Sequence, residues 1–345
     1  MENYSEFINR YDYAVPKELI ATRPEEPREN ARLLTYRKKT GEISLGHFYD
    51  LPQILGPKMV LVFNETRVIP ARITGTLSTG GKVEITVVGI QDLFIKTLSS
   101  RRVDEGAEVM VGEEVFVARK REKQFTYYTT RMKADEVRSF LDAHGEAPLP
   151  PYIKDTPLSS EEAKALYQTV FARNDGSVAA PTASLHFSEK LMTELKVRGV
   201  QIEFVTLHVG LGTFLPVTEK HIAEGKLHEE EYFINSETAD RINEARRSGK
   251  KIIPVGTTSL RTLESAADES GLLTHLSGAT RLFIRPGYKF KVTDGLITNF
   301  HVPKSSLLML VDAFLGDEEK WRRVYKTAMR NQLRFFSFGD GMLVL

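Results

Sequence analysis

Residues 251–261 read Lys-Ile-Ile-Pro-Val-Gly-Thr-Thr-Ser-Leu-Arg, a short apolar run that passes through one glycine and three hydroxyl residues into a helical pattern. An apolar run of this length before a turn signal is typical of a buried strand. Hydroxyl residues just after such a run often mark the start of a helix. The stretch therefore predicts a strand that turns directly into a helix, which is the repeating unit of an α/β fold.

The same alternation of strand and helix continues on both sides of this stretch. Strands are expected at 33–36, 42–48, 59–63, 200–206, 251–255 and 281–284. Helices are expected at 160–167, 188–198, 236–248, 258–267, 305–314 and 317–329. This order favours an α/β domain with a mostly parallel sheet.

Between about residues 67 and 130 the pattern changes to short alternating strands separated by Gly turns. Expected strands lie at 72–74, 82–87, 93–96, 114–117 and 124–128. Regularly spaced short strands without helices indicate a small barrel or sandwich. Prolines at 148, 150 and 151 end the pattern, because proline continues neither a strand nor a helix. We therefore expect a β domain at 66–150, inserted into an α/β domain made of 1–65 and 151–345.

Composition excludes several classes of protein. The 345 residues carry a net charge of +1, so nucleic acid would have to bind a local basic patch. The chain has no cysteine, which excludes disulfides, thiolate zinc sites, Cys nucleophiles and Cys-held iron–sulfur clusters. No apolar run reaches the roughly 20 residues of a membrane span, and no signal-peptide pattern is present. The histidines show no metal-ligand spacing, and we expect a cytoplasmic protein without a metal.

Two Gly-containing segments are candidate ligand sites. Free N–H groups after Gly256, at the positive end of a helix dipole, favour an anionic group, and Arg261 could add a donor. The alternative is an ordinary strand–helix turn with a Thr or Ser cap. Segment 207–214, Leu-His-Val-Gly-Leu-Gly-Thr-Phe, has two glycines at which the backbone could approach a ligand closely. The alternative interpretation is that segment 207–214 is an ordinary surface loop.

Histidines and basic clusters are the remaining candidates. His186 and His301 each lie beside an aromatic residue before a predicted helix. Imidazole is the natural proton carrier near neutral pH, although a single histidine is often structural. Basic clusters at 119–121, 246–251 and 322–326 could contact phosphates or form solvated faces.

Several longer segments follow one another along the whole chain. They are Phe-Asn-Glu-Thr-Arg-Val-Ile-Pro-Ala-Arg at 63–72, Pro-Leu-Pro-Pro-Tyr-Ile at 148–153, Tyr-Gln-Thr-Val-Phe-Ala at 167–172, Gly-Ser-Val-Ala-Ala-Pro-Thr-Ala at 176–183, the segment 207–214, Val-Gly-Thr-Thr-Ser at 255–259, Arg-Thr-Leu-Glu-Ser at 261–265, Pro-Gly-Tyr-Lys-Phe at 286–290, Asp-Gly-Leu-Ile-Thr-Asn-Phe-His at 294–301 and Arg-Phe-Phe-Ser-Phe-Gly-Asp at 334–340. In this order and spacing they resemble the S-adenosylmethionine:tRNA ribosyltransferase-isomerase family of queuosine biosynthesis. The chain departs from the family's usual residues at Glu65, Ser184, Leu215, Arg285 and Gly341.

The resemblance implies a fold and a reaction. The fold would be an α/β/α sandwich with an inserted six-stranded Greek-key β-barrel. The reaction would transfer and isomerise the ribosyl moiety of S-adenosylmethionine onto 7-aminomethyl-7-deazaguanine at the tRNA wobble position. The products would be epoxyqueuosine-tRNA, adenine and methionine. S-adenosylmethionine is then a co-substrate, no other cofactor is expected, and tRNA is the partner of a monomer.

The resemblance also directs attention to particular residues. A base must remove a proton next to the sulfonium sulfur, and the candidates are His186, His208, His301 and Glu230, with His186 and His208 favoured. Expected S-adenosylmethionine contacts are Thr182, Gly210, Gly212, Thr213, Phe214, Gly256, Thr257, Thr258, Ser259 and Arg261. Expected tRNA contacts are Arg67, Arg72, Arg246, Arg247 and Lys304.

Two other functions stay open at this point. One is a tRNA-binding protein of the same fold without turnover, for which Ser184 and Leu215 are the motive. The other is an α/β enzyme that binds a phosphorylated small molecule at 256–259.

Overall fold

Strand β3 (Met59–Asn64) shows why the α/β part of the chain forms around a buried sheet. Its apolar side chains are fully buried, Val60 and Val62 on one face and Leu61 and Phe63 on the other. Successive residues of a strand face opposite sides of the sheet, so an unbroken apolar run needs cover on both sides. Three helices supply that cover: α7 (Ser236–Arg247) and α8 (Thr257–Ala266) on one face, and α5 (Glu189–Val197) on the other.

The sheet around β3 has five strands in the order β14-β3-β12-β13-β15. The other strands are β12 (Gln201–Leu207), β13 (Lys226–Phe233), β14 (Lys251–Pro254) and β15 (Ser277–Leu282). β14, β3 and β12 run parallel, whereas β13 and β15 are antiparallel to their neighbours. The expectation of a mostly parallel sheet is therefore wrong. The strand expected at 281–284 also begins and ends earlier, as β15.

A second, four-stranded sheet has the order β16-β17-β1-β2. Its strands are β1 (Arg32–Arg37), β2 (Glu42–His47), β16 (Leu296–Asn299) and β17 (Gly341–Val344). Helices α9 (Ser306–Leu315) and α10 (Glu318–Arg330) belong to the hydrophobic core on one side of this sheet. The two sheets join where Val255 bridges Ile297 and the Gly256 N–H donates to the Ile297 carbonyl at 2.7 Å. This junction places the start of α8 beside the end of β16.

The inserted part is a closed antiparallel barrel with the order β10-β7-β6-β5-β8-β9. Its strands are β5 (Arg72–Leu77), β6 (Lys82–Ile90), β7 (Ile95–Ser99), β8 (Glu108–Val111), β9 (Glu114–Glu122) and β10 (Phe125–Thr129). β8 returns to lie beside β5 after the β5-β6-β7 meander, which is Greek-key connectivity. Helix α3 (Ala134–His144) follows the barrel and closes one end of its core.

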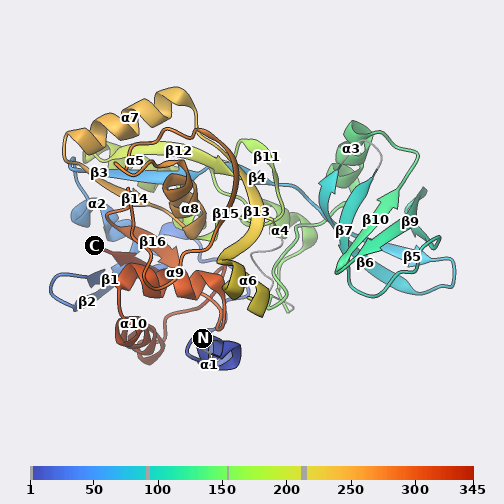
Figure 1. Cartoon of the computed structure of the whole chain (residues 1–345), viewed down its shortest axis with the longest axis horizontal. Helices are drawn as coiled ribbons and strands as arrows, with labels where there is room; N and C mark the ends of the chain where they lie inside the picture. Colours follow the sequence, from blue (N-terminus) through green and yellow to red (C-terminus); the bar gives the residue numbers. More distant parts are fainter. Residues whose placement is uncertain (1–2, 91–93, 154, 211–215) are drawn as a thin grey trace.

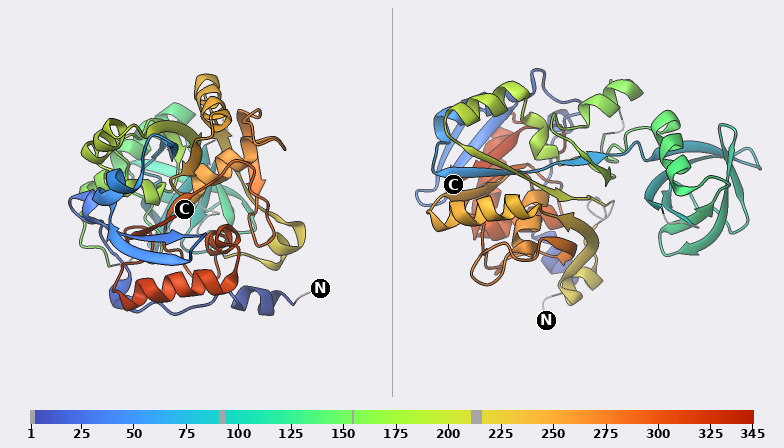
Figure 2. Two further views of the ribbon diagram at one scale, coloured as in Figure 1. Left: turned by 90° about the vertical axis from the view of Figure 1, so that its left-hand side faces the viewer. Right: turned by 90° about the horizontal axis from the view of Figure 1, so that it is seen from above.

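The computed structural model describes residues 3–90, 94–153, 155–210 and 216–345. The barrel projects from one side of the α/β body (Figures 1 and 2). Strand β4 (Thr66–Val68) leads into it and pairs in parallel with β11 (Asn174–Ser177) in the body. The domain limits at 65/66 and 150/151 stay predictions.

Short elements complete the described chain. They are α1 (Tyr4–Asn9), η1 (Lys17–Leu19), η2 (Arg28–Asn30), η3 (Phe48–Asp50), α2 (Leu51–Ile54), α4 (Ser160–Leu166), η4 (Thr182–His186) and α6 (Glu219–Glu224). Among the described residues, no helix combines the length and apolar character needed to cross a membrane.

Candidate active site

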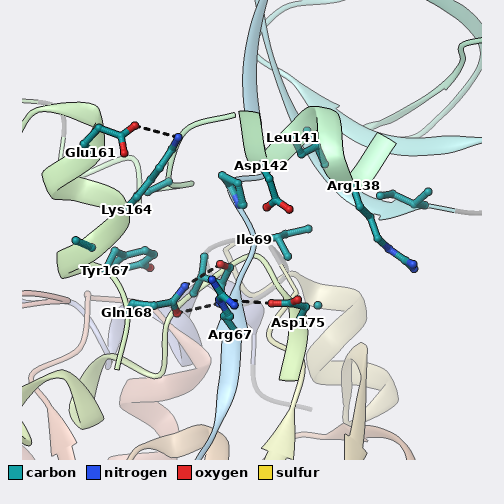
Figure 3. A pocket seen from close by; sticks show the side chains of 16 residues that line it. Arg67, Ile69, Arg138, Leu141, Asp142, Glu161, Lys164, Tyr167, Gln168 and Asp175 are labelled. Atoms are coloured by element: carbon teal, nitrogen blue, oxygen red, sulfur yellow. Dashed lines mark hydrogen bonds and ion pairs between the residues drawn. The ribbon is translucent and has the colours of Figure 1, made fainter. Parts of the chain in front are cut away.

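A cleft of about 870 Å³ lies where the barrel meets the α/β body (Figure 3). Its walls come from β4 and the loop after it, from α3, from α4 and the turn that follows, and from β11. The lining side chains include Arg67, Ile69, Arg138, Leu141, Asp142, Lys164, Tyr167, Gln168 and Asp175. This volume falls within the range of roughly 300–1,000 Å³ that is common for small-molecule sites.

Charges of both signs face this cleft. The Nε of Arg67 lies 3.6 Å from Asp175 Oδ1, and Lys164 Nζ lies 3.2 Å from Glu161 Oε1. Gln168 fixes the β4 backbone, because its Oε1 accepts from the Val68 N–H at 3.0 Å and its Nε2 donates to the Val68 carbonyl at 2.9 Å. Figure 3 shows Arg67 between Gln168 and Asp175. The cleft is therefore polar, with an exposed guanidinium on a firmly held strand.

His208 follows β12 and lies next to the cleft wall. Its ring Nδ1 is 2.9 Å from Thr66 Oγ1, and its backbone N–H donates to the Glu231 carbonyl at 2.9 Å. The backbone of Gly176, which lines the cleft, packs so closely that a Cβ there would lie 2.9 Å from Nδ1. Burial lowers the pKa of His208, while the charges of Glu231 and Asp175 oppose that shift. The half-buried ring is thus neutral near pH 7 and able to accept a proton.

His186 and His301 occupy a different environment. His186 is buried and stacks on Phe48 with ring centroids 4.2 Å apart. Burial, together with the charges of Arg334 and Arg28, lowers its pKa to about 3. His301 is also buried, its Nε2 lies 2.8 Å from Thr298 Oγ1, and burial lowers its pKa to about 3. An imidazole with so low a pKa is a weak base near neutral pH.

A second hollow of about 60 Å³ lies at the junction of the two sheets. The structure brings together here five residues that the sequence singled out: Thr182, Gly256, Thr257, Thr258 and His301. Sequence reasoning did not select Tyr152, Thr298, Asn299 and Ser337, which also line it. Tyr152, Thr298 and Asn299 lie inside the matched segments 148–153 and 294–301, and Ser337 inside 334–340, so that signal was available.

The start of α8 is open toward this hollow. Gly256 has φ 90° and precedes the helix without any side-chain cap. The buried Thr258 Oγ1 has no hydrogen-bond partner in the described part of the chain. Ser259 differs, because its Oγ donates to the Val255 carbonyl at 2.9 Å. The hydroxyl of Thr258 is therefore available to a ligand, and that of Ser259 is committed to the fold.

Arg261 and Glu230 form a buried ion pair between Nη1 and Oε2. Arg261 Nε also donates to the Leu282 carbonyl at 3.2 Å, and Glu230 Oε1 accepts from the Gly210 N–H at 3.1 Å. Glu230 lies within β13. The pair links α8, β13 and Gly210. Gly212, Thr213, Phe214 and Leu215 lie outside the described residues.

The cleft and the hollow share a wall. Gly176 lines the cleft and Val209 lines the hollow. The Val178 N–H donates to the Val209 carbonyl at 3.0 Å, and the Val209 N–H donates to Ser177 Oγ at 2.9 Å. Segments 176–178 and 208–210 therefore lie between the cleft and the hollow, and the His208 ring packs against Gly176.

The expected tRNA-contacting residues are dispersed. Arg67 lines the cleft, and Arg72 pairs with Glu146 at 3.1 Å where the chain enters the barrel. Three others serve in local contacts: Arg246 donates to the Lys291 carbonyl at 2.6 Å, Arg247 lies 3.7 Å from Glu244, and Lys304 lies 2.8 Å from Asp12. Helix α7, which carries Arg246 and Arg247, lies in the part of the body away from the barrel (Figures 1 and 2).

Two of the departures from the resembled family are Arg285 and Ser184. Arg285 donates to the Ile222 carbonyl at 3.1 Å, near the end of α6. Ser184 is fully buried, and its Oγ has no hydrogen-bond partner in the described chain. The described residues contain no group of three or more His, Asp or Glu side chains placed to hold a metal ion.

The fold and site define a two-part enzyme of the α/β class, with an inserted Greek-key barrel and a polar cleft between the two parts. The chain belongs to the family described as queuosine biosynthesis protein, which it matches over residues 8–344. This membership confirms the resemblance that the ordered segments indicated.

Individual relatives agree with that family. A protein of Thermoanaerobacter sp. named S-adenosylmethionine:tRNA ribosyltransferase-isomerase is 44% identical, with 98% of this chain and 99% of the relative covered. A protein of the same name from Caldanaerobacter subterraneus is 45% identical over the same shares. The crystal structure of an S-adenosylmethionine tRNA ribosyltransferase from Thermotoga maritima is similar with a TM-score of 0.56 and 32% identity, covering 97% of this chain and 100% of that one. The expected fold class and the expectation of a transferase are confirmed.

Proposed function

We propose that this protein transfers and isomerises the ribosyl moiety of S-adenosylmethionine onto 7-aminomethyl-7-deazaguanine at the tRNA wobble position, with epoxyqueuosine-tRNA, adenine and methionine as products. The observation that carries this proposal is the similarity over 98% of the chain to proteins named S-adenosylmethionine:tRNA ribosyltransferase-isomerase. The cleft supports it, because its 870 Å³ can accommodate a nucleobase turned out of its stack together with part of a second substrate.

The two spaces suggest how the substrates divide. The hollow of about 60 Å³ is too small for a whole S-adenosylmethionine, so it takes one end of that molecule. The uncapped start of α8 and the Thr258 hydroxyl favour an anionic end, which is the methionine carboxylate. The wobble base occupies the cleft, beside Arg67. Arg261 supports the site indirectly, because its charge is balanced by Glu230.

His208 is the base in this proposal. It accepts the proton from the carbon next to the sulfonium sulfur, and the electron pair of the broken C–H bond stays on that carbon. His208 is neutral, half-buried and beside the cleft, whereas His186 and His301 are buried and weakly basic. That the chain works as a monomer in the cytoplasm stays a prediction from the family resemblance.

Release of adenine from S-adenosylmethionine tests this function. We expect release only when tRNA carrying 7-aminomethyl-7-deazaguanine is added, and none with tRNA carrying guanine at the same position. Chromatography of the free base measures it. Binding of both substrates without adenine release would instead establish the tRNA-binding protein without turnover.

A further inference from the structure

Thr66 occupies an unusual place for a buried hydroxyl. It is the first residue of β4, it is fully buried, and its Oγ1 lies 2.9 Å from His208 Nδ1. Its backbone N–H donates to Asn64 Oδ1 at 3.1 Å, and the same amide group of Asn64 holds both the N–H and the carbonyl of Leu207, the residue before His208. Thr66 and His208 are therefore held in register by one shared side chain.

The hydroxyl has one proton and two neighbours that could receive it. One neighbour is the Asn174 carbonyl at 3.4 Å, which can only accept a hydrogen bond. The other is the imidazole Nδ1 at 2.9 Å, which donates or accepts according to its tautomer. Both contacts can be hydrogen bonds at once only if Nδ1–H donates to Thr66, because the single hydroxyl proton is then left for the Asn174 carbonyl. The arrangement favours Nδ1–H as the donor to Thr66, with the hydroxyl proton directed to Asn174.

That assignment decides which ring nitrogen is free. In a neutral imidazole one nitrogen carries the proton and the other accepts. A proton on Nδ1 leaves the lone pair on Nε2, which has no hydrogen-bond partner among the described residues. The backbone of Gly176 packs directly against the same ring. A Cβ at this residue would lie 2.9 Å from Nδ1, and its φ of 142° also disfavours a side chain.

We propose that Thr66 is a positioning residue, which fixes His208 in the Nδ1–H tautomer and keeps Nε2 as the proton acceptor for the reaction. This inference rests on the proposed role of His208 as the base. Two nearby carboxylates, Glu231 on β13 and Asp175 on β11, act on the same ring, and Arg67 balances Asp175.

Nuclear magnetic resonance of the full chain with ¹⁵N-labelled histidine tests the tautomer directly. The His208 signals are assigned by their loss in His208→Gln. We expect the wild-type ring to carry its proton on Nδ1, Thr66→Val to show a mixture of tautomers, and Thr66→Ser to restore the wild-type pattern. Proton exchange next to the sulfur of S-adenosylmethionine should fall about tenfold in Thr66→Val, the usual effect of losing one hydrogen bond, and recover in Thr66→Ser.

Each outcome decides one claim. A wild-type ring with its proton on Nε2, or a tautomer unchanged in Thr66→Val, overturns the role of Thr66. A changed tautomer with undiminished exchange in Thr66→Val also overturns it, because the tautomer would not matter to the reaction. If His208→Gln retains exchange, the proposed base is wrong. The spectra would then still show whether Thr66 sets the tautomer of His208.

Discussion

The three candidate histidines lie in two kinds of environment, and the environment rather than the residue type separates them. His186 is enclosed in the core, whereas His301 is buried at the wall of the small hollow, and burial lowers the pKa of each to about 3. His208 sits at the cleft wall with a hydroxyl at one nitrogen. At the scale of single residues, the packing of His208 against Gly176 of the cleft wall favours His208 as the base.

The two enclosed histidines should affect stability rather than chemistry. Their folded pKa of about 3 is below the unfolded value of roughly 6.5, so the unfolded chain binds protons that the folded chain does not. Stability from these groups is present above about pH 6.5 and is lost progressively as the pH falls toward 3. The slope of the free energy of unfolding against pH reports how many protons the chain takes up when it unfolds. We expect His186→Phe to lower that number by up to one, measured by urea unfolding between about pH 5 and 8. An identical dependence in the variant would show that His186 is not held neutral.

The buried pair of Arg261 and Glu230 gives a second prediction. Arg261→Met removes one partner and leaves a carboxylate inside the protein, which we expect to lower the free energy of unfolding by roughly 3–5 kcal/mol. Arg261→Met combined with Glu230→Leu should recover much of that loss, because both members of the ion pair are then replaced by apolar side chains. Urea unfolding of the single and double variants measures both effects. If the single variant is as stable as wild type, the ion pair does not support the fold as described.

At the scale of elements, the start of α8 separates two neighbouring hydroxyls. Thr258→Val removes a buried hydroxyl without a partner, so we expect unchanged stability and an S-adenosylmethionine affinity lowered about tenfold. Ser259→Ala is the matched control, since its hydroxyl is bonded to the Val255 carbonyl. That variant should lose stability and keep its affinity. Calorimetric titration with S-adenosylmethionine compares the two variants. Equal affinities would show that the Thr258 hydroxyl at the start of α8 does not contact S-adenosylmethionine.

Elements with strong local patterns could be predicted from the sequence. β3 and β14 were predictable as short apolar runs, and the alternating strands before Thr129 indicated a barrel. β13 and β15 were missed or misplaced, because they form the partly exposed end of the sheet and their sequences are polar. β17 was missed because it is only four residues long and its burial comes from partners far away in the sequence.

The site was predictable only in part, because several of its contacts join residues that are far apart in the sequence. Thr182, Gly256 and Thr258 were found through their motifs, and they do meet at one hollow. The contact between Thr66 and His208 depends on the pairing of β4 with β11 and of β3 with β12, which no local pattern encodes. The pairing of Arg261 with Glu230 likewise joins an α8 residue to a strand that the sequence did not show.

At the scale of the whole molecule, the cleft between barrel and body predicts where tRNA binds. We expect tRNA affinity to fall steeply with salt, because phosphate contacts release counterions. Arg67→Gln should weaken binding and reduce the salt slope by about 1, as for one lost phosphate contact. Arg247→Gln is the matched control, an exposed arginine with a carboxylate neighbour on α7. Filter binding at several salt concentrations measures both, and weaker binding in the Arg247 variant alone would place tRNA on α7 instead.

The most direct measurement of the central claim is the mass of the wobble nucleoside after reaction. tRNA carrying 7-aminomethyl-7-deazaguanine is incubated with S-adenosylmethionine and either wild type or His208→Gln, then digested and analysed by mass spectrometry. The account predicts that wild type converts the nucleoside to epoxyqueuosine, and that His208→Gln binds tRNA normally but converts it roughly 10²–10⁴ times more slowly. An unchanged nucleoside with the folded wild-type protein would contradict the proposed function, and full conversion by His208→Gln would contradict the assignment of the base.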